Sequence, residues 1–294
     1  MTRIFYSPAY VSSGYAFDTT RKAEWIADSL DASPIRGIEL VEPAPLTEEQ
    51  VAATHTPDYI SAVRTGHPAE LAESQGFTWD SNLWPMALAC SGGVVAAALA
   101  ALSDGVSGAI SNGFHHARAD RGAGFCTFNG LVIAAREALA AGAKSVLILD
   151  FDAHCGGGTA LLIADEPRIW QVDVSVSAFD RYRTSQRVRL TLVNKASEYV
   201  STINRRLTEL DNEGIDFDLC IYNAGMDPHE SCSIGGLSGI TRETLAEREK
   251  QVFGWCKRRA LPVAFVPAGG YVSFELDEAA LVGLHRLTLE EAAA

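Results

Sequence analysis

The chain has 294 residues, of which 47% are hydrophobic and 21% charged, a composition that excludes a disordered protein and a length that is sufficient to bury a large core. The formal net charge of −13 argues against nucleic acid or an anionic membrane surface as the main partner. It fits a neutral or cationic ligand, or an acidic surface that keeps the protein soluble.

The sequence of the N-terminal third predicts a helix packed inside the protein, and it predicts neither a signal peptide nor a membrane-spanning helix. The opening MTRIFYSPAY lacks the apolar core of a signal peptide. The stretch GGVVAAALAAL (92–102) is too short to cross a bilayer and is typical of an Ala-rich helix packed inside a protein. We therefore expect no contact with a membrane.

From residue 107 onward, predicted strands and helices alternate. Strands are expected at 107–113, 144–152, 168–180, 217–227 and 261–271, and helices at 128–143, 196–214 and 241–260. The run KSVLILDFD (144–152) is almost continuously apolar, as in a strand that is covered on both faces. This alternation predicts an α/β fold with a mainly parallel central sheet and helices on both faces. Because no linker or repeat interrupts it, we expect one domain over residues 1–294.

Six cysteines are scattered along the chain without a CxxC pair, at positions 90, 126, 155, 220, 232 and 256. Such spacing predicts reduced thiols and a cytoplasmic protein.

Polar side chains cluster where the predicted strands end. These are His115 and His116, the segment from Asp152 to His154, Asp227, and Tyr271. In a parallel α/β sheet, ligands bind at the carboxyl ends of the strands. We therefore expect four strand ends to meet at one edge of the sheet, which favours an enzyme.

The motif DFDAH (150–154) predicts a metal site. In a strand that persists to its end, Asp150, Asp152 and His154 would point to the same face, and Asp227 would supply a third ligand from another strand. Aspartate oxygen and histidine nitrogen suit Zn²⁺, and also Fe²⁺, Co²⁺ or Mn²⁺. The alternative is that the motif caps a strand or belongs to an ion-pair network.

Four segments in this order make the chain similar to the zinc-dependent histone deacetylase and acetylpolyamine amidohydrolase family of the arginase-deacetylase superfamily. They are GFHHARADRGAGFCTFNGLVIAA (113–135), VLILDFDAHCGGGT (146–159), NAGMDPHESCSIGGLSGIT (223–241) and PAGGY (267–271). YSPAY (6–10), THTPDYISAV (54–63) and ACSGGVVAAALAAL (89–102) also resemble that family's N-terminal part. The resemblance implies a single-domain arginase/deacetylase-like fold of three layers.

The resemblance also implies a role for each residue of the site. The metal ligands would be Asp152, His154 and Asp227. The tandem histidines His115 and His116 would face the attacking water, Asp150 would hold His115, and Tyr271 would donate to the substrate carbonyl. Gly124 and Phe125 would form one wall of a narrow acyl-lysine channel.

On this basis we expect a deacylase that hydrolyses an N-acyl amide with His116 as general base and Tyr271 as oxyanion donor. The acyl group expected first is acetyl, carried on acyl-lysine, an acetylpolyamine or a small metabolite. The expected metal is Zn²⁺, with Fe²⁺ and Co²⁺ as alternatives. The resemblance adds a structural K⁺ or Na⁺ held by the backbone carbonyls of Asp150, Asp152 and His154 and by Ser175. The oligomeric state stays open, with a homo-oligomer among the alternatives.

The sequence departs from the family after His154. Relatives read H-H-G-D-G or H-H-G-N-G, whereas this chain reads His154-Cys155-Gly156-Gly157-Gly158. Gly157 cannot orient His116 as an Asp or Asn would, so His116 is held by another group or a water, or is less basic. Cys155 is either a small buried filler or a redox-sensitive thiol.

These departures leave alternative functions open. A non-catalytic, metal-containing binding protein of the same fold would keep the site and lose turnover through Gly157. An arginase-type ureohydrolase with two Mn²⁺ ions would need more aspartates. The segment after Ser175 also departs from the family, with Phe179 and Tyr182 as wall residues, and a channel lined differently implies a substrate other than acetyl-lysine in a histone tail. The basic residues between 181 and 195 are either solvated or receive an acidic group of the substrate.

Overall fold

The strands form one parallel sheet in the computed structural model. The structure describes residues 1–14 and 18–294, and it describes the side chains of residues 1–14 and 21–294. The eight strands of these ranges are β1 (Thr2–Phe5), β2 (Ile38–Val41), β3 (Val106–Ala109), β4 (Val146–Asp150), β5 (Ile169–Ser175), β6 (Val188–Leu192), β7 (Leu219–Gly225) and β8 (Val263–Ala268). Their order is β2-β1-β3-β8-β7-β4-β5-β6, and every pair of neighbours is parallel.

The centre of the sheet is buried on both faces. Every residue of β4, β7 and β8 is buried, as their continuous apolar runs predict for parallel strands with helices above and below. The register between β4 and β7 places Asp150 beside Asn223, at the end from which the site is built.

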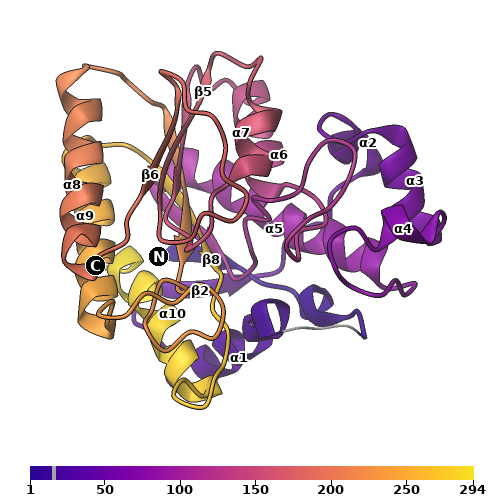
Figure 1. Ribbon diagram of the computed structural model, residues 1–294, viewed down its shortest axis with the longest axis horizontal. Coiled ribbons are helices and arrows are strands. Elements are labelled where there is room, and N and C mark those ends of the chain that lie inside the picture. The colour runs from indigo at the N-terminus through magenta and orange to yellow at the C-terminus, as the bar shows by residue number, and fades with distance from the viewer. Residues whose placement is uncertain (15–17) are drawn as a thin grey trace.

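Helices cover both faces of the sheet (Figure 1). They are a 3₁₀ turn η1 (Pro8–Val11), α1 (Asp18–Ala32), α2 (Glu48–Ala52), α3 (Pro57–Thr65), α4 (Ala69–Ala72), α5 (Leu83–Asp104), α6 (Gly130–Ala140), α7 (Gly157–Leu162), α8 (Ala196–Asn212), α9 (Arg242–Arg258) and α10 (Glu278–Ala292). Figure 1 shows α8, α9, α10 and α1 on one side of the strands and α5, α6 and α7 on the other, with α2, α3 and α4 beyond α5. The predicted α/β fold with helices on both faces is confirmed.

Helix α5 is the apolar helix expected around 92–102, but it begins earlier, at Leu83. By length and composition alone it could cross a membrane, yet 72% of its most apolar window is buried in the fold. It packs against β1, β3, β8 and α6, so its apolar surface is covered by protein.

The strands end earlier than the sequence predicts. Strand β4 ends at Asp150 rather than at 152, because Asp150 Oδ1 accepts the amide of Asp152 (3.3 Å) and Asp152 Oδ1 accepts the amide of His154 (2.9 Å). Side-chain oxygens thus replace the ladder and bend the chain. The sequence analysis missed β1, β2 and β6, which are short and partly exposed.

Candidate metal and catalytic site

The carboxyl ends of four neighbouring strands meet at one edge of the sheet. Strands β3, β8, β7 and β4 are consecutive in the sheet order, and each is followed by one group of polar residues. These are His115 and His116 after β3, Tyr271 after β8, Asp227 after β7, and Asp152 and His154 after β4. The predicted convergence of the four strand ends is confirmed.

Asp152, His154 and Asp227 form a buried cluster. One ligand atom from each lies within 4.8 Å of the others. His154 Nδ1 is 3.1 Å from Asp152 Oδ1 and 3.0 Å from Asp227 Oδ2. Asp227 Oδ2 is fully buried, and this contact with His154 places it where it could share a ligand with the other two residues. Two carboxylates and an imidazole fit Zn²⁺, Fe²⁺, Co²⁺ or Mn²⁺.

A turn, and not a continuing strand, brings Asp152 and His154 together. The expectation that Asp150, Asp152 and His154 share a strand face is wrong, because β4 ends at Asp150 and residues 152–154 bend. Asp227 anchors this bend, since its Oδ1 accepts the amide of Ala153 at 3.0 Å. Asp150 stands outside the three-ligand cluster.

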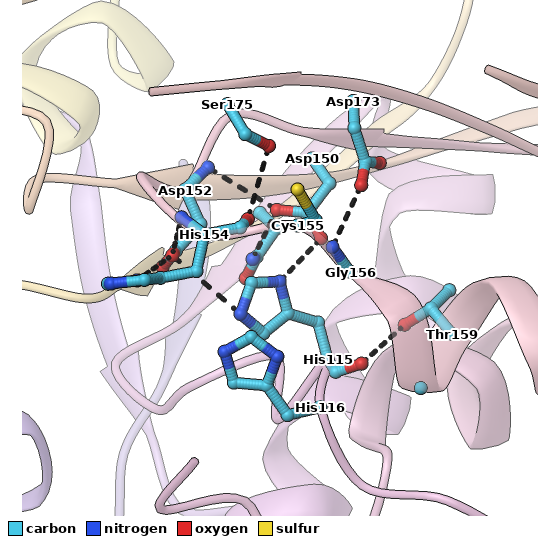
Figure 2. Close-up of polar contacts among 12 residues, drawn as sticks. His115, His116, Asp150, Asp152, His154, Cys155, Gly156, Thr159, Asp173 and Ser175 are labelled. Atoms are coloured by element: carbon cyan, nitrogen blue, oxygen red, sulfur yellow. Dashed lines mark hydrogen bonds and ion pairs between the residues drawn. The ribbon is translucent and has the colours of Figure 1, made fainter. Parts of the chain in front are cut away.

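Asp150 instead contacts His115 (Figure 2). Its Oδ2 lies 2.7 Å from His115 Nδ1, and its Oδ1 accepts Nδ2 of Asn223 at 2.8 Å. Burial acts to lower the pKa of His115, but the carboxylates of Asp150 and Asp152 outweigh it and raise that pKa to about 10. Sequence reasoning missed Asn223, although it stands in the quoted segment NAGMD.

The ring of His116 lies against that of His115, with centroids 3.9 Å apart. Burial and the charge of His115 lower the pKa of His116 to about 4. His116 is therefore neutral near pH 7 and able to accept a proton.

Tyr271 follows a glycine pair that turns tightly beside Asp227. Gly269 has a positive φ of 53°, and a Cβ there would lie 2.3 Å from Asp227 Oδ1, so only glycine fits. The Tyr271 amide donates to Cys232 Sγ at 3.0 Å. Burial and the nearby carboxylates, Asp227 first, raise the pKa of Tyr271 well above its ordinary value, so its phenol keeps the proton.

A cavity of about 280 Å³ lies over this group. Its lining residues are His116, Gly124, Phe125, His154, Ser177, Phe179, Ile234 and Tyr271. The expected wall residues Gly124, Phe125 and Phe179 are thus among them, whereas Tyr182 is not: its hydroxyl donates to the carbonyl of Arg189 (3.1 Å). Phe179 is 52% exposed and meets the rings of His116 and His154 edge-on, with centroids 5.0 and 5.9 Å away.

The residues expected around a monovalent cation lie on the ends of β4 and β5. Ser175 is buried, and its Oγ donates to the carbonyl of His154 at 3.2 Å. Cys155 is also buried, and its Sγ donates to the carbonyl of Ser177 at 3.3 Å. Burial raises the pKa of Cys155 to about 12, which favours the filler role over a reactive thiolate.

Asp180 is a second polar residue of the site that sequence reasoning missed. Its Oδ2 lies 3.0 Å from His116 Nδ1, in the place that Gly157 leaves without a side chain. Of the alternatives stated for His116, the structure shows the one in which another group holds it. The sequence around Asp180 does not predict this contact, because the contact forms only when the turn that carries Asp180 folds back onto α7.

Comparison with known proteins identifies related sequences. The family model described as "Histone deacetylase domain" matches residues 17–287. A protein of Picosynechococcus sp. described as uncharacterised is 32% identical over 222 residues, covering 74% of this chain and 73% of its own. Histone deacetylase 2 of Arabidopsis thaliana is 27% identical over 249 residues, covering 79% of this chain and 63% of its own.

The similarity to larger proteins covers only part of them. Human polyamine deacetylase HDAC10 is 28% identical over 163 residues, which is 50% of this chain and 24% of that protein. The crystal structure of the HDA15 HD domain superposes with a TM-score of 0.80 at 17% identity, covering 99% of this chain and 89% of that one. This last likeness confirms the expected fold.

Proposed function

The chain belongs to the histone deacetylase family, and from this premise we propose that it is a metal-dependent deacylase that hydrolyses an N-acyl amide, acetyl in the first instance. The observation that carries the proposal is the buried cluster of Asp152, His154 and Asp227 beside His116 and Tyr271, with a cavity above it. A metal-ligand set, a neutral histidine and a protonated phenol are the groups that metal-assisted hydrolysis requires.

Asp152, His154 and Asp227 would hold the metal, for which we propose Zn²⁺, with Fe²⁺ and Co²⁺ as alternatives. When bound, such an ion polarises a carbonyl and lowers the pKa of water. We also propose K⁺ or Na⁺ at the backbone carbonyls of Asp150, Asp152 and His154 with Ser175. The contact of Ser175 Oγ with the His154 carbonyl supports this position.

His116 would move the proton. Its Nδ1 is engaged by Asp180, and this leaves Nε2 to take a proton from the attacking water and to return it to the leaving amine. His115, held by Asp150, packs against His116 and limits its movement.

Tyr271 would donate its phenol proton in a hydrogen bond to the substrate carbonyl oxygen as that oxygen gains charge. One such donor contributes about 3–4 kcal/mol to the stability of the transition state. Phe125 and Phe179 would flank the substrate chain and exclude water from the reacting amide.

For the substrate, we propose an acyl group on an aliphatic amine: acyl-lysine, an acetylpolyamine or a small metabolite amide. Among the described residues that line the cavity of about 280 Å³, none is a carboxylate, and Phe125, Phe179 and Ile234 are apolar. This lining favours the neutral aliphatic segment next to the acylated nitrogen inside the cavity, so the ammonium groups of an acetylpolyamine would lie outside it.

We propose a cytoplasmic location, which is supported by six buried cysteines without disulfides. The net charge of −13 supports partners other than nucleic acid and membranes.

The test is turnover by the Zn²⁺-loaded protein with acetyl-lysine peptides, acetylpolyamines and simple N-acetyl amines. We expect turnover of at least one substrate, and a loss of about 100-fold or more in kcat for Tyr271→Phe and for His116→Ala. Tyr6→Phe, at a tyrosine that packs edge-on against Tyr10, is the matched control and should keep wild-type activity. Absence of turnover with every substrate would refute the proposal in favour of the non-catalytic binding protein.

A further inference from the structure

His116 needs a partner at Nδ1 if it is to act as a base through Nε2. A neutral imidazole carries one proton, and an acceptor at one nitrogen keeps the proton there and leaves the other nitrogen free. The segment Cys155-Gly156-Gly157-Gly158, which follows His154, offers no carboxylate or amide side chain that can do this.

Asp180 occupies this position from another part of the chain. Its Oδ2 lies 3.0 Å from His116 Nδ1 and also accepts the amide of Gly158 at 3.2 Å. Its Oδ1 accepts Nη2 of Arg118 at 2.5 Å. Both carboxylate oxygens are therefore fixed, and the side chain of Asp180 is only 5% exposed.

Asp180 can reach this position because residue 157 is a glycine and has no side chain. A Cβ on Gly157 would lie 2.3 Å from the carbonyl oxygen of Asp180 and 2.6 Å from its Cγ. These distances are too short for any side chain, so the turn that carries Asp180 fills the volume that a side chain at 157 would take. The amide of Cys155, which donates to the carbonyl of Phe179 at 3.0 Å, pins the same turn.

We propose that Asp180 is the positioning residue of His116, supplied by the turn after β5 in place of a side chain at position 157, and that Arg118 holds it there. The inference rests on the proposed function. It adds that Asp180 can contact His116 because residue 157 is a glycine, which leaves room for the turn that carries Asp180.

The charges around Asp180 agree with this role. Burial acts to raise the pKa of Asp180, but the contacts with His116 and Arg118 outweigh it, so the carboxyl stays ionised. An ionised carboxylate is an acceptor only, so the proton it shares with His116 resides on Nδ1.

The position of Asp180 also links the base to the wall of the cavity. Phe179, its neighbour in sequence, lines the cavity and meets the His116 ring edge-on at 5.0 Å. One turn thus sets both the orientation of the base and one wall, so a change in the turn acts on the chemistry and on substrate binding together.

The test compares Asp180→Ala and Asp180→Asn. Asn keeps an oxygen acceptor for Nδ1–H, and Ala keeps none. The control is Asp120→Asn, which removes a charge from an exposed carboxylate that pairs with Arg121 at 3.4 Å. Arg118→Gln tests the support of Asp180 without touching the carboxylate, and Arg121→Gln is its control.

The first readout is the tautomer of His116, measured by ¹⁵N NMR on the protein without substrate, with the signal assigned by its loss in His116→Ala. We expect the proton on Nδ1 in wild type, Asp180→Asn and Asp120→Asn, and a loss of that preference in Asp180→Ala. The second readout is kinetic: Asp180→Ala should lower kcat by about 10–100-fold, and Asp180→Asn should recover most of the loss. If Asp180 had a purely structural role, both variants would lose kcat to the same extent and the tautomer of His116 would stay unchanged.

The two readouts separate the two proposals. If wild type turns over no substrate, the deacylase proposal fails, while the tautomer still decides the role of Asp180. If Asp180→Ala keeps the proton on Nδ1 and full kcat, the positioning role is refuted. Should Asp180→Ala fail to fold, the wild-type tautomer decides: a proton on Nε2 of His116 would refute the positioning role of Asp180. An unchanged tautomer together with unchanged kcat in Arg118→Gln would overturn the part assigned to Arg118.

Discussion

Replacing Gly157 by alanine adds one methyl group beside the turn that carries Asp180. The new Cβ would lie 2.3 Å from the Asp180 carbonyl oxygen, and ordinary contact begins at 3.4 Å, so the turn must move by 3.4 − 2.3 = 1.1 Å. The contact is with backbone, which cannot rotate away as a flexible side chain would. A movement of this size away from His116 would take the 3.0 Å contact between Asp180 Oδ2 and His116 Nδ1 beyond hydrogen-bond distance.

Two effects of the alanine on stability oppose each other. Gly157 is not among the residues with positive φ, so alanine fits the backbone and by itself would stabilise the protein by about 0.4–1 kcal/mol. Overpacking costs about 1–3 kcal/mol. We therefore expect a net loss of about 1–2 kcal/mol in the free energy of unfolding. For a chain of 294 residues, this lowers Tm by about 2–3 °C.

The effect on activity should exceed the effect on stability. Loss of the partner of His116 should lower kcat by about 10–100-fold at a temperature where the variant is fully folded. The assay is steady-state turnover of the best acetylated substrate, with Tm from calorimetry. Gly254→Ala is the control: it lies within α9, where the new Cβ would meet Arg258 Nη1 at an ordinary 3.5 Å, so it should leave kcat unchanged and should raise Tm slightly rather than lower it. Wild-type kcat in Gly157→Ala, with a crystal structure in which Asp180 still contacts His116, would refute the reasoning.

Three further predictions concern the metal, stability against pH, and the cavity wall. Asp152→Asn should lose stoichiometric Zn²⁺ in elemental analysis of the dialysed protein while Asp120→Asn retains it; full occupancy in Asp152→Asn would make the ligand assignment wrong. Burial lowers the pKa of His55 to about 4, whereas in the unfolded chain this histidine takes up a proton near pH ~6.5. The stability that neutral His55 contributes above pH ~6.5 is therefore lost as the pH falls towards 4. The free energy of unfolding, measured with urea, should fall by about 2 kcal/mol less between pH 7 and pH 5 in His55→Gln than in wild type. An equal fall in the two proteins would contradict this. Phe179→Ala should raise KM more than it lowers kcat, because the exposed ring contacts His116 only by its edge; an equal fall of kcat and kcat/KM would argue against a wall role.

Much of the site could be predicted from the sequence, because the carboxyl ends of parallel strands meet at one edge wherever the strands are neighbours. The apolar runs of β4, β7 and β8, each followed by a polar group, were sufficient to bring Asp152, Asp227 and Tyr271 together. The short outer strands were missed because partly exposed segments of four or five residues carry little periodic signal.

The details of the ligand geometry could not be predicted in this way. Strand alternation was the wrong reason for grouping Asp152 with His154, since a hydrogen bond from the His154 amide to Asp152 Oδ1 forms a turn there. Side-chain to backbone bonds of this kind compete locally with the strand, and the pattern of residue types does not show which wins.

The sequence by itself determined the central strands of the sheet, the family and the residues available at the strand ends, because these follow from periodicity and from motifs along the chain. Only the tertiary structure decided what holds His116. The sequence shows that Gly157 lacks a side chain, but the volume it leaves is filled from a distant turn, and that approach depends on packing in three dimensions. It is the turn after β5, held against the start of α7, that brings Asp180 to His116.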